Sequence, residues 1–278
     1  MKLSELAELL SSAGISSPEY DARELFFAFG GFDRGRLLCA DDSSEREELL
    51  TAAKRRIARE PLQYIVGEVA FYRELYRVTP DCLIPRADTE ILVDTAVKRM
   101  PSGARFLDLC CGSGCVGIST LKSTEGTRCT FADISEGAIA LTLENAERNG
   151  VPDRCRTVRA DLLSEESVPA VTEDERFDVI LSNPPYVKSS VYKTLDSEIF
   201  AEPEIAFVGG EDGADFYRTL TPLYLPYLKE GGFIAYEIGY DQREIITEIA
   251  RENGCCAEII KDYSGLDRVA VLTKIRNG

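Results

Sequence analysis

Phe106-Leu107-Asp108-Leu109-Cys110-Cys111-Gly112-Ser113-Gly114 is the stretch that decides the fold. Its first residues are typical of a buried strand, and its two glycines predict a tight turn that leads into a helix. Glycine lets the backbone of such a turn approach a ligand closely, and the start of the next helix favours a negatively charged group. By itself, this pattern is only a weak indication of a nucleotide site.

Four other residues bear on a nucleotide ligand. Gly117 completes a G-x-G-x-x-G spacing with Gly112 and Gly114, so an NAD-type dinucleotide remains open at this point. Asp133 ends the next predicted strand, where its carboxylate would accept both hydroxyls of a ribose or else cap the following helix. Asp161-Leu162 follows the third strand and would meet an adenine ring, or else form a surface turn.

The order of predicted elements outside the glycine-rich loop indicates an α/β domain. Strands are predicted at residues 105–109, 128–132, 155–159, 177–181 and 233–238, with helical patterns such as 136–149 and 241–253 between most of them. This alternation predicts a doubly wound, mainly parallel sheet. The tail at residues 256–275 predicts two further strands joined around Ser264-Gly265. Open sheets of this kind bind ligands at the carboxyl ends of their strands, which would bring the three candidate cofactor segments together.

The first 60 residues or so predict three helices instead. The second begins at Ser17-Pro18 and ends at Gly30-Gly31, and the third runs from about residue 44 to 59. The third helix is expected to present one apolar face made by Leu49, Leu50, Ala53 and Ile57. Its basic run, residues 54–56 with Arg59, favours a solvated face over a basic groove.

Residues 64–83 predict a hairpin around Gly67, and a helix is predicted at about residues 88–100. We therefore expect two domains. Residues 1–76 would form a helical substrate-recognition domain with the start of the hairpin, and residues 77–278 would form the α/β domain.

Composition excludes several kinds of chemistry. The chain has 278 residues, nine cysteines, no histidine and a formal net charge of −16. Without histidine there is no Ser-His nucleophile, and a zinc site lacks its usual ligands, so we expect no metal. The negative charge counts against a large phosphate-contacting surface. No signal-peptide core or membrane-spanning run is evident, which predicts a cytoplasmic protein with free thiols.

Asn183-Pro184-Pro185-Tyr186 closes the predicted strand at residues 177–181. Proline has no N–H, so this turn offers carbonyl oxygens and few donors. The Asn183 oxygen and the Pro184 carbonyl would accept both hydrogens of a planar NH2 group, while the Tyr186 ring covers its face. A nitrogen held in this way can turn its lone pair toward an electrophile. The alternative is a proline-stiffened turn after a core strand.

Residues 108–114, Asp133, Asp161 and residues 183–186 resemble, in this order, the motifs of class I S-adenosylmethionine-dependent methyltransferases. Asn-Pro-Pro-Tyr is shared by members that methylate planar nitrogens, in adenine or in protein glutamine. The chain is similar nearly from end to end to the release factor glutamine methyltransferases of the PrmC/HemK family, in residues 60–67, 71–72, 83–90, 202–203 and 209–213. Cys110-Cys111 departs from the usual Gly-Thr, and Ala87 replaces a common proline.

The resemblance implies a Rossmann-like domain with an antiparallel C-terminal strand, preceded by a helical domain and a β-hairpin connector. It implies that S-adenosylmethionine is the methyl donor and S-adenosylhomocysteine the product. The implied cofactor residues are Asp108, Cys110, Cys111, Gly112, Ser113, Gly114, Asp133, Asp161, Leu162 and Asn183. The implied substrate-binding residues are Asn183, Pro184, Pro185 and Tyr186, of which Asn183, Pro184 and Tyr186 would be catalytic.

The implied substrate is the glutamine of the Gly-Gly-Gln motif in class I peptide chain release factors. We expect a monomer with no direct contact to nucleic acid or membrane. Methyl transfer from a positively charged donor needs mainly positioning, so the absence of histidine does not oppose it. Three alternatives remain open: an adenine-type amino methyltransferase, an enzyme for a ribosomal-protein glutamine, and a cofactor-binding protein without catalysis.

Overall fold

A seven-stranded sheet forms the centre of the larger part of the molecule. The computed structural model describes residues 1–275, so the last three residues of the predicted α/β domain lie outside the described part. The strands follow the order β5-β4-β3-β6-β7-β9-β8. They are β3 (Arg105–Leu109), β4 (Arg128–Asp133), β5 (Cys155–Arg159), β6 (Phe177–Ser182), β7 (Leu228–Glu237), β8 (Cys255–Lys261) and β9 (Asp267–Lys274).

The pairing of these strands confirms the predicted fold class. The five strands from β5 to β7 are mutually parallel, whereas β9 is antiparallel to both β7 and β8. The strand order changes direction at β3, since β4 and β5 lie on one side of this strand and β6 and β7 lie on the other. The two strands predicted in the tail are therefore present as the edge hairpin β8–β9.

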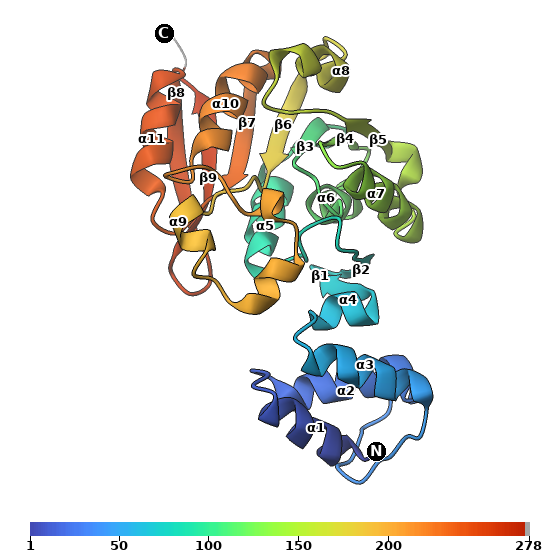
Figure 1. The fold of residues 1–278 in the computed structure, drawn as a ribbon. Coiled ribbons are helices and arrows are strands. Elements are labelled where there is room, and N and C mark those ends of the chain that lie inside the picture. The colour runs from blue at the N-terminus through green and yellow to red at the C-terminus, as the bar shows by residue number, and fades with distance from the viewer. Residues whose placement is uncertain (276–278) are drawn as a thin grey trace. The chain divides into compact units, whose positions relative to one another are not determined.

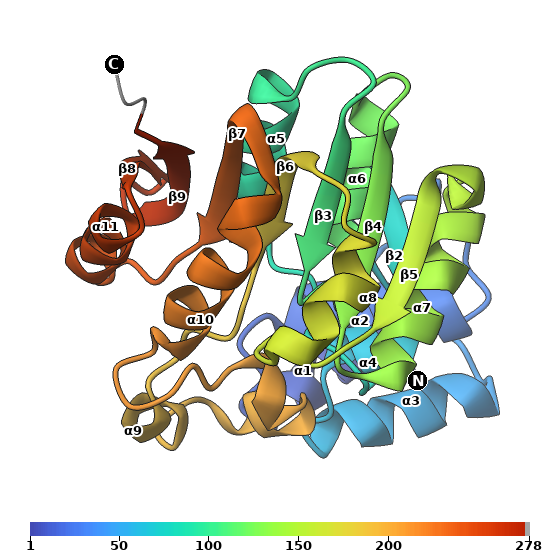
Figure 2. The same ribbon diagram turned by 90° about the horizontal axis from the view of Figure 1, so that it is seen from above.

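Helices cover both faces of this sheet (Figure 2). One face packs on α5 (Glu90–Arg99), α6 (Cys115–Ser123) and α7 (Glu136–Arg148), whose apolar side chains share a core with Phe106 and Phe131. The other face packs on α8 (Val168–Thr172), α10 (Asp215–Tyr224) and α11 (Arg243–Glu252), around Tyr217 and Tyr236. A short helix, α9 (Ser189–Tyr192), follows the Asn183–Tyr186 turn. The inner strands β3, β4 and β6 are thus buried on both sides, which is why they are mostly apolar, whereas the edge strand β5 is only partly buried.

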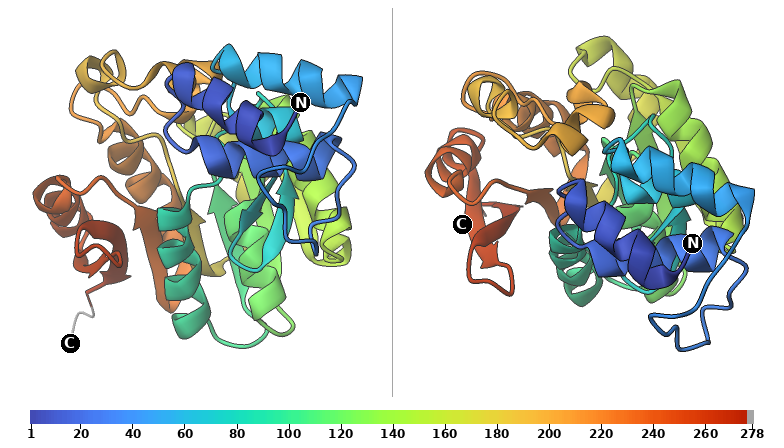
Figure 3. Two further views of the ribbon diagram at one scale, coloured as in Figure 1. Left: turned by 90° about the horizontal axis from the view of Figure 1, so that it is seen from below. Right: turned by 60° about the horizontal axis from the view of Figure 1, so that its bottom comes forward.

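The N-terminal helices form a separate compact unit with its own core. Its elements are α1 (Leu3–Ser12), α2 (Pro18–Phe29), α3 (Glu47–Ile57) and α4 (Leu62–Val66), and the first three appear in blue in Figure 3. The three predicted helices are confirmed. Ser17 precedes α2 as expected, but its side chain makes no capping hydrogen bond.

The buried face of α3 is different from the predicted one. Leu49, Ala52, Ala53 and Arg56 are buried, whereas Leu50 and Ile57 are partly exposed. Arg56 is only 4% exposed, because its guanidinium bonds to Asp21 at 2.6 Å, to the Glu60 carbonyl and to Glu198. The predicted solvated face is therefore wrong for Arg56. A guanidinium can be buried when acceptors surround it, and these acceptors come from distant positions.

Contacts divide the chain at residues 68 and 69, and they place residues 196–201 with the helical unit. The predicted boundary at residues 76 and 77 had included the start of the hairpin with the helices. The hairpin consists of β1 (Glu68–Phe71) and β2 (Glu74–Arg77), preceded by α4 rather than by strand. Phe71 and Tyr76 are buried with the residues of α5 and α6, which explains why the hairpin belongs with the sheet.

Within residues 1–275, none of the helices combines the length and apolar character that crossing a membrane requires.

Candidate active site

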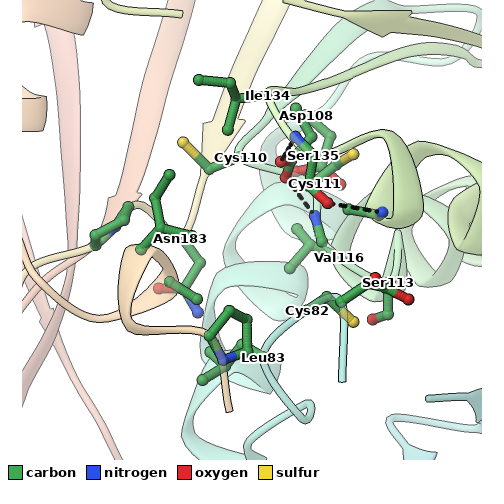
Figure 4. Close-up of a pocket in the computed structure, with 18 of the residues that line it drawn as sticks. Cys82, Leu83, Asp108, Cys110, Cys111, Ser113, Val116, Ile134, Ser135 and Asn183 are labelled. Carbon is green, nitrogen blue, oxygen red and sulfur yellow. Dashed lines mark hydrogen bonds between the residues drawn. The ribbon is translucent and has the colours of Figure 1, made fainter. Parts of the chain in front are cut away.

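One pocket gathers most of the residues that the sequence singled out. It lies where β3, β4 and β6 end, and all of its lining residues belong to the sheet unit. Figure 4 shows Asp108, Cys110 and Cys111 of the glycine-rich loop, Ile134 and Ser135 after β4, Asn183 after β6 and Leu83 after β2 around a common space. The predicted meeting of these segments at the carboxyl ends of the strands is therefore observed.

The glycine-rich loop is held in place from behind by α7. The Thr142 hydroxyl donates to the Gly112 carbonyl at 3.0 Å, and the Asn145 amide donates to the Ser113 carbonyl at 2.9 Å. Gly112 and Gly114 both have positive φ, which glycine adopts without strain. These contacts leave the loop backbone beside the pocket, which Gly112 and Ser113 line and Gly114 does not.

Cys110 occupies an unusual backbone conformation in this loop. Its φ is +58°, in the left-handed region that favours glycine. The loop nevertheless keeps its turn, since Ser182 donates to the Leu109 carbonyl at 2.7 Å and Cys111 N–H donates to the Ala132 carbonyl. Both cysteines line the pocket, and burial raises the pKa of each thiol well above its usual range. These thiols are therefore protonated, weakly reactive side chains.

Gly117 is required by packing. A β-carbon at this position would come within 2.3 Å of the Phe131 ring, and within 2.8 Å of the Asp108 carboxylate. The third glycine of the G-x-G-x-x-G spacing thus lets α6 approach the sheet closely, and its role is packing, not contact with a ligand.

Asp133 presents its carboxylate to the pocket. Its Oδ2 accepts the Gly112 N–H at 2.9 Å, and its Oδ1 accepts the Ser135 N–H at 3.0 Å. Ser135, not Asp133, caps α7, because its hydroxyl accepts the Ala138 N–H. Burial raises the pKa of Asp133, while its backbone hydrogen bonds act in the opposite direction. Each carboxylate oxygen retains a lone pair, so the residue fits a ligand that carries two adjacent hydroxyls.

Asp108 is almost fully buried at the inner end of the pocket. Its Oδ2 accepts the Gly117 N–H at 2.9 Å. Burial raises the pKa of this carboxyl to about 8, and the Gly117 hydrogen bond opposes the shift. Its charge therefore depends on what occupies the pocket near neutral pH.

The remaining cofactor candidates give the pocket an apolar side. Asp161 is exposed and accepts the Leu163 N–H in a local turn, as the surface-turn alternative anticipated, but it also lines the pocket. Leu162 is buried and lines the pocket as well. Sequence reasoning missed Ile134, Leu163, Ile205 and Phe216, which add apolar surface here.

Of the Asn183–Tyr186 turn, Asn183 and Pro185 line the pocket, whereas Pro184 is buried and Tyr186 is not among the lining residues. The Tyr186 hydroxyl donates to Glu237 at 3.0 Å, and its carbonyl accepts the Gln242 amide at 3.1 Å. Gly209 and Gly213 pack directly behind the turn, because a β-carbon on either would lie within 2.5 Å of its carbonyl oxygens. The turn is thus firmly held in one position.

Two further segments line the pocket near Asn183. Leu83, Pro85 and Arg86 come from the chain before α5, and Pro203 comes from the chain after residue 201. Glu202 joins them, since its carboxylate accepts the Ile84 N–H at 2.8 Å and pairs with Arg86. Both segments resemble family motifs, but no chemistry in the sequence alone assigned them a role.

Comparisons with known proteins agree with this geometry. The family model "PrmC N-terminal domain" matches residues 2–67, and "Methyltransferase small domain" matches residues 87–207. A release factor glutamine methyltransferase of Geobacter sulfurreducens is 37% identical over 94% of this chain and 91% of its own length. The chain belongs to the release factor glutamine methyltransferase family.

A second relative supports the same assignment, and one solved structure supports the fold. A release factor glutamine methyltransferase of Clostridium botulinum is 35% identical, over 94% of each protein. The crystal structure of a methyltransferase from Pyrococcus furiosus is 20% identical, with a TM-score of 0.53 over 72% of this chain and 89% of that one, and shares the fold. The NAD-type alternative is replaced by this family membership.

Proposed function

We propose that this chain methylates the side-chain nitrogen of the glutamine in the Gly-Gly-Gln motif of class I peptide chain release factors, with S-adenosylmethionine as methyl donor. The observation that carries the proposal is Asn183. Its amide faces the same pocket as Asp133 and the glycine-rich loop, so a planar NH2 group and a nucleoside-bearing donor would meet there.

The pocket residues fit S-adenosylmethionine. Asp133 has free lone pairs for ribose hydroxyls, Leu162 and Ile134 offer apolar surface for adenine, and the loop from Cys110 to Ser113 offers backbone for the amino-acid part. The bound cofactor would supply a methyl group on a positively charged sulfur. Asp108 and Asp133 add negative charge around such a cation.

Asn183 and the Pro184 carbonyl would hold the substrate amide by accepting its two N–H hydrogens. This contact opposes amide resonance and directs the nitrogen lone pair, and Pro185 and Tyr186 keep the turn in place. The methylated nitrogen is acidic and releases its proton to water, so no histidine is required.

The helical unit would recognise the release factor. One glutamine side chain offers too little surface to select a single cellular protein, so selection needs contacts elsewhere. Large apolar side chains are exposed on this unit, namely Leu9, Tyr20, Leu37, Leu50, Ile57 and Phe200.

A labelled methyl-transfer assay on purified release factor, with mass mapping of the modified residue, tests this function. Labelled methyl on the Gly-Gly-Gln glutamine is expected from the wild type. Asn183→Ala should reduce kcat by about a hundredfold while cofactor affinity changes little, because it removes an orienting contact. Label on a ribosomal-protein glutamine or on nucleic acid, and none on release factor, would instead assign one of the alternatives. Cofactor binding without any transfer would favour a binding protein.

A further inference from the structure

The hydroxyl of Thr89 bonds to Asn183 and lies near Glu237, and these two residues come from separate parts of the chain. The Asn183 Nδ2 donates to Thr89 Oγ1 at 3.2 Å. Thr89 is also close enough to Glu237 to lower the pKa of that carboxyl. Thr89 is only 2% exposed, so bulk water does not compete for its hydroxyl.

Thr89 does not use this hydroxyl for the helix that it precedes. It ends a short helical turn, Ala87–Thr89, that leads directly into α5, and its backbone angles are helical, with φ −65° and ψ −18°. A side chain in this conformation does not cap the helix, and Thr89 makes no capping hydrogen bond. The hydroxyl is directed toward the pocket side instead. The hydroxyl is therefore available to side chains from other parts of the chain.

Glu237 is a buried carboxylate at the end of β7. Its Oε1 accepts the Tyr186 hydroxyl at 3.0 Å, while Oε2 has no partner of full hydrogen-bond geometry within residues 1–275. Burial raises the pKa of Glu237, and contacts with Thr89 and Tyr186 and the charge of Arg268 oppose that shift. The Glu237 carboxylate therefore contacts Tyr186 directly and lies near Thr89, which bonds to Asn183.

These contacts have a direction. Glu237 Oε1 accepts the Tyr186 hydroxyl and Oε2 has no other donor in the described part of the chain, so Oε2 is the acceptor nearby for the single hydroxyl hydrogen of Thr89. The Thr89 oxygen is then an acceptor, and only the NH2 end of Asn183 can satisfy it. The opposite end of the Asn183 amide, its carbonyl oxygen, is consequently turned away from Thr89.

We propose that Glu237 and Thr89 are positioning residues, which together fix the Asn183 amide so that its oxygen, not its NH2 group, faces the substrate. This inference rests on the proposed amide-binding role of Asn183. In the reverse orientation two NH2 groups would face each other, and the substrate nitrogen would lose the acceptor that orients it.

Substitutions at Thr89 separate orientation from packing. Thr89→Val keeps the shape and removes the hydroxyl, and Thr89→Ser keeps the hydroxyl. Thr89→Val should lower kcat by about tenfold to a hundredfold, the range for removing a group that orients a functional ligand. Thr89→Ser should stay within about threefold of wild type, and calorimetric affinity for S-adenosylhomocysteine should be unchanged in both.

Thr95→Val is the matched control. Thr95 is a buried threonine of α5, the helix that follows Thr89, and its hydroxyl donates to the Ile91 carbonyl. This variant should retain wild-type kcat. Normal kcat in Thr89→Val, or equal losses in Thr89→Val and Thr89→Ser, would overturn the positioning role.

A second measurement does not depend on the substrate. The chain has only five asparagines, so selective ¹⁵N labelling gives few side-chain NH2 signals, and Asn183→Ala identifies the signal of Asn183. Its NH2 hydrogens should exchange with water faster in Thr89→Val and in Glu237→Gln than in wild type. Unchanged exchange would overturn the inference, whereas wild-type protein that fails to methylate release factor would refute only the proposed function.

Discussion

The Gly112 N–H donates to the Asp133 carboxylate across 2.9 Å, so the glycine-rich loop is fixed to the end of β4. The second oxygen of Asp133 holds Ser135 in the same way. The carboxylate thus orders the loop while it keeps lone pairs for a ligand.

Asp133→Ala should weaken binding of S-adenosylhomocysteine by about 1.5–3 kcal/mol, the range for hydrogen bonds to a charged group. Asp133→Asn keeps one acceptor oxygen and should lose less. Calorimetry measures both. Equal affinity in all three proteins would leave Asp133 with a purely structural role, which thermal unfolding would report.

Cofactor binding should depend on pH through the buried carboxyls. Burial raises the pKa of Asp108 to about 8, and raises that of Asp133. A bound cation favours their ionised forms, so S-adenosylmethionine should bind more tightly as pH rises from about 6 to 9. S-adenosylhomocysteine lacks the sulfonium charge, so its affinity should vary less. Calorimetry with both ligands over this range would refute the idea if the two slopes were equal.

The free protein should show the opposite trend in stability. A carboxyl whose pKa is higher in the folded than in the unfolded protein stabilises the folded state fully at pH values below its unfolded pKa. This stabilisation is lost as the pH rises toward the folded pKa. For Asp108 this window runs from about 4 to about 8. Asp108→Asn should reduce the fall in unfolding free energy with rising pH, as denaturation measurements at several pH values would show. The same pH dependence as in wild type would contradict the raised pKa.

At position 110, glycine should be more stable than alanine. Cys110 has a φ of +58°, and a β-carbon in this region costs about 1–2 kcal/mol. Alanine gains only about 0.4–1 kcal/mol over glycine through the unfolded chain. Cys110→Gly should therefore exceed Cys110→Ala in unfolding free energy by about 0.5–1 kcal/mol.

The neighbouring cysteine provides the control for this comparison. Cys111 is not among the residues with positive φ, so Cys111→Ala should be the more stable of its pair. Denaturant unfolding of the four variants decides the matter. The same order at both positions would show that the loop conformation carries no strain.

Arg56→Met should destabilise the helical unit by about 3–5 kcal/mol, because it leaves Asp21 buried without its positive partner. Asp21→Asn in the same chain should recover part of the loss. Arg55→Met is the matched control, since Arg55 pairs with Glu60 at the surface and should cost about 0–1 kcal/mol. Equal effects of the two arginine substitutions in chemical unfolding would contradict the buried network.

Recognition by the helical unit can be tested at its surface. Leu37 is 87% exposed there, and Tyr263, on the sheet unit, is 89% exposed. Leu37→Ser combined with Tyr20→Ser should lower kcat/KM for intact release factor. The expected loss corresponds to about 1–2 kcal/mol of binding free energy, as for contacts at an interface. Methylation of a short Gly-Gly-Gln peptide should not change, and Tyr263→Ser should affect neither substrate. Equal kcat/KM of all variants on intact release factor would refute this recognition surface.

Much of the fold could be predicted because it follows local patterns. The apolar runs before Gly112 and Asn183 gave β3 and β6 to within a residue, since a strand that is buried on both faces is apolar along its length. Helical patterns that combine apolar and charged residues were less informative. The apolar spacing of α3 predicted Leu50 and Ile57 as buried, whereas Arg56 takes that place, because pattern alone counts a guanidinium as a surface group.

By itself, the sequence determined the order of strands and helices, the glycine-rich loop, and the Asn183–Tyr186 turn at the end of a strand, because each depends on residues that are close together in the chain. Only the tertiary structure decided which of these side chains share a pocket, that Tyr186 bonds to Glu237, and that Thr89 lies against Asn183. It also decided that Glu198 meets Arg56, 142 positions away. Burial and hydrogen bonding of these groups depend on contacts between distant segments, and periodicity along the chain carries no record of those contacts.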